Sequence, residues 1–350
     1  MNVQKTCFLL ILLSISVISR AQTLGGNSVF NFLKYSNTPQ LTALGGINIS
    51  QQTEDIGLSF HNPALLRESM HTQTHVAFSS LSGAVRNYHL LTGYHSEKLK
   101  TNFALGVNYF NYGATTQTDQ AGNILGEFKP ADYVIQVSAS RQYLQRWHYG
   151  ASLKFIYSSY GAYRSSGIAM DAGVTYTDTA NLLQVALTLK NMGVQLKAYE
   201  GTSKDDLPFD LQMGISKRLA KAPIQFSLTL HHLHQFNLRY DDSSFNADNG
   251  FDQDNGKNMF VDKVFRHIVL ATQLFIADKI EISAGYNYLR RKELNTGNQG
   301  NGLNGFSFGV GILVKKIQIR YARTYYQNNF ANNQIGISFS FKQFSPGQKN

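Results

Sequence analysis

Apolar and polar residues alternate along much of the chain from residue 71 onward, in segments of about ten residues separated by turn residues. Ile280 and Ile282, for example, alternate with Glu281 and Ser283, and residues 306–312 repeat the pattern. A period of two is typical of a β-strand, because successive side chains point to opposite faces. On this basis we predict fourteen strands: 73–81, 87–95, 102–112, 131–143, 146–159, 167–178, 181–191, 208–218, 222–236, 262–277, 279–291, 303–314, 315–326 and 331–342.

The connections between these strands alternate in length. Short ones follow the even-numbered strands, and include residues 144–145, 179–180 and 219–221. Long ones follow odd-numbered strands, and include residues 113–130, 192–207, 237–261 and 292–302. Short turns on one rim and long loops on the other are typical of outer-membrane barrels. In lipid such a sheet must close, because no water is present to satisfy the polar groups of an open edge.

The composition supports the same class. Charged residues make up only 15% of the chain, against about 25% in a typical soluble domain, and there are 19 Tyr and 23 Phe. A soluble β-sandwich or propeller, the alternative, would carry a charged outward face and would not sort its connections by length. No segment after residue 21 approaches the ~20 apolar residues of a membrane helix.

We therefore predict an all-β protein, a fourteen-stranded antiparallel transmembrane β-barrel that is integral to a bacterial outer membrane. The barrel is expected over residues 71–342, and residues 343–350 form a C-terminal tail. Both termini of such barrels face the periplasm, so the long loops are expected to be extracellular.

The first 21 residues are typical of a secretory signal peptide. Lys5 precedes an apolar core at residues 7–18, and the small residues Ser19 and Ala21 flank Arg20 before an expected mature start at Gln22. The single cysteine lies inside this peptide, so the mature chain has no disulfide. The net charge of +10 is spread over isolated residues rather than a basic stripe, which argues against nucleic acid as a partner and favours lipid phosphates or acidic sugars.

Residues 22–70 lack the barrel periodicity and contain Gly45-Gly46 and Asn62-Pro63-Ala64. Apolar clusters within the segment, such as residues 29–33 and 41–44, favour an ordered structure over a disordered tail. We therefore expect the segment to fold inside the barrel as a hatch.

Three short motifs in this N-terminal region carry a resemblance to known proteins. They are Phe30-Asn31-Phe32-Leu33, Ala43-Leu44-Gly45-Gly46 and Asn62-Pro63-Ala64-Leu65-Leu66. With the fourteen strands that follow, the chain resembles the fatty-acid transporter (FadL-like) superfamily of outer-membrane barrels. Within it, the motifs resemble the PorQ family of Bacteroidetes type IX secretion proteins, a sister family of PorV.

The resemblance implies a non-enzymatic scaffold in the attachment complex of type IX secretion. Such a barrel would anchor a PorZ-like surface protein beside the PorU/PorV-like sortase machinery, which joins cargo to anionic lipopolysaccharide. The alternative within the same superfamily is an outer-membrane transporter of hydrophobic compounds.

Two motifs match enzyme signatures in sequence but not in their predicted structural context. Residues 305–309 spell G-x-S-x-G around Ser307, but that motif needs a strand-to-helix turn, and Ser307 lies in the middle of a predicted strand. Residues 300–305 spell G-x-G-x-x-G, which here leads from a loop into a strand rather than into a helix. We predict no enzymatic activity and no cofactor.

Metal sites are not predicted either. On a continuous strand His232 and His234 would share a face and His231 would point away, leaving fewer ligands than zinc needs. The acidic loop at residues 241–258 offers Asp252 and Asp254 as calcium candidates, with a solvated surface loop as the alternative, because no Glu closes an EF-hand pattern.

The four long loops form the predicted docking platform for a surface partner. Their aromatic residues Phe128, Tyr199, Phe245 and Phe251 are the candidate contacts, because aromatic anchors carry much of the binding energy of interfaces.

Overall fold

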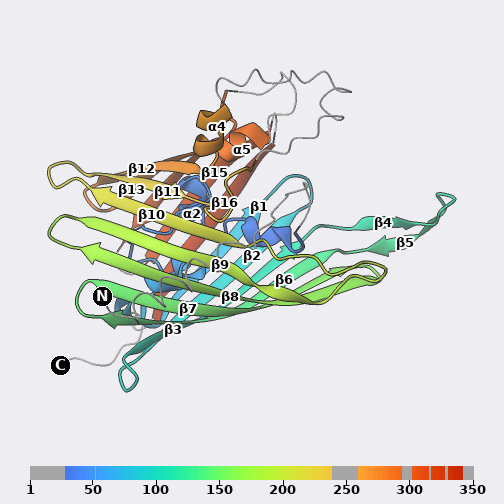
Figure 1. Cartoon of the computed structure of the whole chain (residues 1–350), viewed down its shortest axis with the longest axis horizontal. Coiled ribbons are helices and arrows are strands. Elements are labelled where there is room, and N and C mark those ends of the chain that lie inside the picture. The colour runs from blue at the N-terminus through green and yellow to red at the C-terminus, as the bar shows by residue number, and fades with distance from the viewer. Residues whose placement is uncertain are drawn as a thin grey trace, which may run out of the picture.

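The computed structural model describes residues 28–51, 53–238, 259–293, 302–314, 317–327 and 330–341. The predicted signal peptide at residues 1–21 and the predicted tail at residues 343–350 lie outside these ranges. Within them, fourteen strands form a closed antiparallel barrel, as predicted (Figure 1).

Every barrel strand pairs with its neighbour along the chain, except that β3 pairs with β6 across an inserted hairpin, and β16 closes the barrel onto β1. The barrel strands are β1 (Gln73–Ser80), β2 (Arg86–Ser96), β3 (Thr101–Asn111), β6 (Ala131–Tyr143), β7 (Trp147–Tyr160), β8 (Tyr163–Asp178), β9 (Leu183–Lys197), β10 (Asp210–Arg218), β11 (Ile224–Leu230), β12 (Ile268–Ile276), β13 (Ile280–Asn287), β14 (Phe306–Leu313), β15 (Ile317–Gln327) and β16 (Phe330–Ser340).

The differences from prediction lie at the rim that carries the long connections. The loop at 113–130 contains a two-stranded hairpin, β4 (Thr115–Thr118) and β5 (Ile124–Phe128). Strand β9 runs to Lys197 instead of ending at residue 191, and β11 ends at Leu230 instead of residue 236.

Two helices replace predicted strand ends. They are α4 (Met259–Phe265), at the start of the predicted strand 262–277, and α5 (Tyr288–Glu293), at the end of the predicted strand 279–291. Asp262 and Arg266 form an ion pair at 2.7 Å with the i, i+4 spacing that stabilises a helix. Charged residues in the last turn of α5 suit a helix in water better than a strand against lipid.

The outward face of the barrel is apolar. On β7, the side chains of Trp147, Tyr149, Leu153 and Phe155 are exposed by 43 to 55% and alternate with buried His148, Ser152 and Lys154. The ten residue-to-residue steps from Trp147 to Tyr157, at about 3.3 Å each and a tilt of roughly 40°, span about 25 Å, the height of the apolar band of an outer-membrane barrel.

Aromatic rings border this band. Tyr88, Tyr109, Tyr133 and Tyr157 form a row across β2, β3, β6 and β7, with ring centroids 4.8 to 6.4 Å apart. At the other end of the strands Trp147 contacts Tyr176 at 5.0 Å. Such girdles lie at the two membrane interfaces. The protein is therefore an integral outer-membrane barrel. Among the residues that the structure describes, no helix combines the length and the apolar character needed to cross a bilayer.

The N-terminal segment, residues 28–51 and 53–70, folds into short helices: η2 (Asn31–Lys34), α2 (Pro39–Ala43), η3 (Ile56–Phe60), η4 (Pro63–Leu65) and η5 (Glu68–Met70). α2 contacts β13 to β16, whereas η4 contacts β6 to β8 and η3 contacts β1 and β2. Because it meets strands on opposite sides of the barrel, and these contacts involve inward-facing residues, the segment occupies the lumen.

Three of these short helices, α2, η3 and η4, begin at a polar side-chain cap. The Thr38 hydroxyl accepts from the Leu41 amide at 3.2 Å, with Pro39 in the first turn of α2. The Asp55 carboxylate accepts from the Gly57 amide at 2.9 Å at the start of η3. These caps satisfy amides that water cannot reach inside the lumen.

Candidate functional site

The Asn62-Pro63-Ala64 turn fits into a depression on the inner face of β7 and β8. The Asn62 side chain accepts from the Ala64 amide at 3.0 Å and donates to the Ile49 carbonyl at 2.8 Å, so it joins two parts of the segment. A Cβ at Gly150 would lie 2.7 Å from the Pro63 carbonyl, and one at Gly173 would lie 2.2 Å from Asn62 Oδ1. Glycine at both barrel positions therefore allows this close approach.

Gly45 and Gly46 end α2 on the opposite wall. Both have positive φ, +87° and +85°, which only glycine adopts without strain. The Arg290 guanidinium donates to the Gly45 carbonyl at 2.9 Å, and Asn287 donates to the same oxygen at 3.2 Å. All five residues of the predicted hatch motif thus contact barrel strands or cap the segment.

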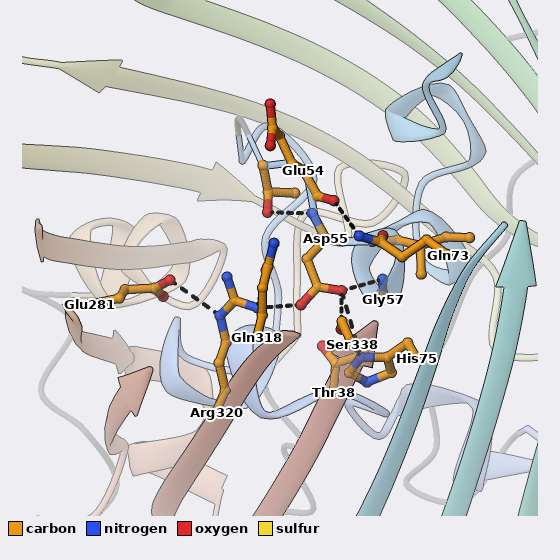
Figure 2. A network of polar contacts seen from close by, with 12 residues as sticks. Thr38, Glu54, Asp55, Gly57, Gln73, His75, Glu281, Gln318, Arg320 and Ser338 are labelled. Atoms are coloured by element: carbon orange, nitrogen blue, oxygen red, sulfur yellow. Dashed lines mark hydrogen bonds and ion pairs between the residues drawn. The ribbon is translucent and has the colours of Figure 1, made fainter. Parts of the chain in front are cut away.

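A buried ion network joins the segment to the opposite strands (Figure 2). Asp55 pairs with Arg320 of β15, and both side chains are at most 6% exposed. Glu281 of β13 accepts from Arg320 Nε at 3.2 Å. Ser338 of β16 donates to the second Asp55 oxygen at 2.7 Å, and His75 of β1 lies 3.6 Å from it. One carboxylate of the segment therefore contacts β1, β15 and β16.

The network also fixes the protonation state of Asp55. Burial raises the pKa of this carboxyl, but the charges of Arg320 and His75 and the hydrogen bonds from Gly57 and Ser338 outweigh burial, so the pKa lies below 3.8. Asp55 is therefore ionised at neutral pH.

A second polar cluster fixes the segment to β7, β8 and β9. Lys154 pairs with Asp171 at 2.5 Å and donates to Asn191 at 2.9 Å, while Lys190 Nζ lies 3.0 Å from His61 Nδ1. Burial, followed by the charges of Lys190 and Lys154, holds the His61 pKa well below its usual range. His61 is therefore a neutral acceptor for the Lys190 ammonium.

A pocket of about 360 Å³ remains between the segment and the strands near the long-connection rim. Its size is that of small-ligand sites. Its apolar lining includes Leu33, Leu41, Ile49 and Leu289. Its charged and imidazole lining comprises Lys34, His61, Lys190, Asp210, His231, His232, Arg290 and Glu293.

The three neighbouring histidines are not arranged as predicted. Because β11 ends at Leu230, they follow the strand rather than continue it, and His232 has a φ of +54°. This turn brings His231 Nδ1 to 2.5 Å from His232 Nδ1, whereas the rings of His232 and His234 are 6.0 Å apart. The prediction that His231 points away from His232 was wrong, because it assumed extended backbone through both residues.

Ser307, the centre of the G-x-S-x-G letters, lies in β14 and faces the lumen, fully buried. Its hydroxyl contacts Thr324 and accepts from Arg290 at 3.1 Å. Ser307 is thus a partner of the arginine that holds Gly45.

At the rim, the predicted aromatic contacts take different positions. Tyr199 is half-buried and packs against Tyr160 at 5.9 Å, and the half-buried Phe128 covers Gly161. Phe245, Phe251, Asp252 and Asp254 lie outside the described residues. The exposed apolar residues of this rim include Ile124 and Leu125 of the hairpin and Phe260, Val261 and Phe265 of α4.

Comparison with known proteins yields distant structural likenesses. No family model matches the chain, and a comparison with curated proteins found no match. A mutant of the monoaromatic hydrocarbon channel TodX aligns over 88% of this chain and 99% of its own, with 13% identity and a TM-score of 0.49. Omp33 of Acinetobacter baumannii aligns over 78% and 99%, with 10% identity and a TM-score of 0.40. The KdgM porin aligns over 77% and 99%, with 8% identity and a TM-score of 0.33. Such low values assign no function to this chain.

Proposed function

We propose that this chain is a non-enzymatic docking barrel of the outer membrane, with its lumen closed by its own N-terminal segment and its rim holding a surface partner. The observation that carries the proposal is the β4–β5 hairpin, which projects well beyond the barrel rim (Figure 1). Its apolar side chains Ile124 and Leu125 are 75% and 62% exposed.

An isolated two-stranded hairpin is marginally stable in water. Strands β4 and β5 pair only with each other among the described strands, so both outer edges of the hairpin are open. A partner that adds a strand to such an edge would bury the backbone groups and the apolar side chains together. The hairpin is therefore suited to bind a protein.

The lumen supports the same function. The Asp55–Arg320 pair and the turn at Asn62-Pro63-Ala64 hold residues 28–70 against opposite walls, as a hatch would be held. Breaking a buried ion pair costs about 3–5 kcal/mol, so release of the segment would be rare. A barrel closed in this way serves as an anchor rather than as an open pore.

The resemblance to the PorQ family suggests the setting: the type IX attachment complex, with a PorZ-like partner. A photo-crosslinking residue at Leu125 in living cells tests the docking function, with the same residue at Asn181 on the opposite rim as the control. We expect a specific surface-protein adduct from position 125 alone. Replacing residues 115–128 with a two-residue turn should release that partner into the medium while the barrel still assembles. A partner that stays at the surface would contradict the proposal.

The pocket in the lumen favours transport of a small hydrophobic compound as the second candidate function. Its apolar residues Leu33, Leu41 and Leu289 line a volume that a small ligand could fill. Uptake of hydrophobic compounds by cells tests this function. Loss of uptake in a strain without this chain, restored by the variant that lacks the hairpin, would favour transport over docking.

A further inference from the structure

Three side chains with metal-binding atoms meet at the wall of the lumen pocket. Asp210 is the first residue of β10, and His231 and His232 follow the end of β11, the strand that pairs with β10. One ligand atom from each lies within 4.8 Å of the other two. Asp210 and His231 are buried, and His232 is half-buried and faces the pocket.

The backbone at His232 places both imidazoles on the same side. Its φ of +54° is a left-handed conformation that costs free energy in a residue other than glycine. Without it, neighbouring residues would point to opposite faces. Strain of this kind clusters at sites where function requires one geometry.

The spacing of the donor atoms suits a tetrahedral ion. Ligands of tetrahedral zinc at about 2.0–2.1 Å lie about 3.3 Å from one another. Here His231 Nδ1 lies 2.5 Å from His232 Nδ1, and His232 Nδ1 lies 3.9 Å from Asp210 Oδ2. These two distances bracket the ideal value, so small rotations of the side chains would complete the coordination.

Neighbouring groups hold the carboxylate in place. The His232 backbone N–H donates to Asp210 Oδ1 at 2.6 Å, and the Gln212 side-chain Nε2 donates to Oδ2 at 2.6 Å. Each oxygen keeps a further lone pair for a metal. Outer hydrogen bonds that orient a ligand in this way are typical of metal sites.

The two imidazoles face each other through their Nδ1 atoms. Without an ion, the two facing Nδ1 atoms must share one proton.

We propose that Asp210, His231 and His232 bind a divalent transition-metal ion of the zinc type, with a fourth position open to the lumen pocket. Two imidazoles and one carboxylate are a ligand set that such ions prefer, whereas calcium and magnesium prefer oxygen alone. Lys34, Lys190 and Arg290 line the same pocket. Their charges disfavour loosely held cations and favour an anion or water as the fourth ligand.

Cobalt(II) titration of the purified full chain, in detergent and without a polyhistidine tag, tests the site. We expect one equivalent to give the visible absorption of a tetrahedral ion, and zinc to displace it. Asp210→Asn and His231→Gln should each weaken binding by at least about tenfold. His234→Gln, which removes the neighbouring imidazole outside the cluster, is the matched control and should leave binding unchanged.

Circular dichroism and the heat-dependent electrophoretic shift of a folded barrel show whether each variant is folded. If Asp210→Asn or His231→Gln does not fold, His232→Gln takes its place in the test. Absence of the cobalt band in the unaltered protein overturns the proposal. A cobalt band that persists in the folded Asp210→Asn and His231→Gln variants also overturns the proposal. The same holds if His234→Gln is the only substitution that removes the band.

Discussion

Asp55 of the N-terminal segment and Arg320 of β15 are 265 positions apart in the chain, yet they form an ion pair inside the lumen. Neither side chain is more than 6% exposed. Glu281 binds the same guanidinium, and Ser338 and His75 contact the same carboxylate. This pair therefore holds the N-terminal segment against β15, β16 and β1, the strands at which the barrel closes.

Asp55→Ala should loosen the segment. It leaves Arg320 buried with one remaining carboxylate, and removal of one partner from a buried pair costs about 3–5 kcal/mol. We expect faster proteolysis within residues 40–60 of the purified protein. The matched control is Asp278→Ala, which breaks the exposed Arg218–Asp278 pair of 2.6 Å on the opposite rim, because exposed pairs contribute little. Equal cleavage of the two variants would contradict a role for the buried pair.

Gly150→Ala should displace the Asn62-Pro63-Ala64 turn, since the new Cβ would lie 2.7 Å from the Pro63 backbone. Overpacking of this kind costs about 1–3 kcal/mol. We expect a lower denaturant midpoint for unfolding. Gly302→Ala, where a Cβ meets no atom within 4 Å, should leave the midpoint unchanged. A Gly150→Ala protein as stable as this control would show that the turn does not rest on β7.

The anchoring of the segment should depend on acid pH through Asp55. Its pKa in the folded protein lies below 3.8, because Arg320 and His75 outweigh the effect of burial. A carboxyl whose pKa is lower in the folded than in the unfolded protein stabilises the fold when the pH lies above its pKa in the unfolded protein. This stabilisation is lost as the pH falls through its pKa in the folded protein. The difference in unfolding free energy between the unaltered protein and Asp55→Asn should therefore be constant at neutral pH and shrink below about pH 4. A difference that instead shrinks between pH 8 and 6 would assign the dependence to other groups.

The long-connection rim should face the outside of the cell. Protease added to intact cells should cut at the hairpin tip, residues 119–123, and spare the short turn at 219–223. Barrels of this class place their short turns in the periplasm. Cleavage at 219–223 alone would reverse the orientation.

The sequence was sufficient to predict the barrel because lipid and lumen impose opposite chemistry on alternate residues. Strand β13 shows this alternation clearly. Its apolar residues Ile280 and Ile282 face outward and its polar residues Glu281 and Ser283 face the lumen, as predicted. Helices α4 and α5 were missed because they lie at the rim, where this contrast ends. There, local pairs such as Asp262–Arg266 determine the structure.

The contacts of the candidate site were harder to predict. Nothing near Asp55 in the sequence indicates Arg320, because the closure of the barrel brings them together. The meeting of His231 and His232 depends on one left-handed residue, which a strand pattern does not predict. Asn62, Pro63 and the paired glycines were easier to single out in the sequence, because these residue types have distinctive turn geometry.

The most direct test of a lumen closed by its own N-terminal segment is the conductance of the purified full chain in a planar lipid bilayer. We expect no steady current steps from the unaltered protein and clear steps from a chain that lacks residues 28–70. Steady steps of the same size from both proteins would contradict the closed lumen.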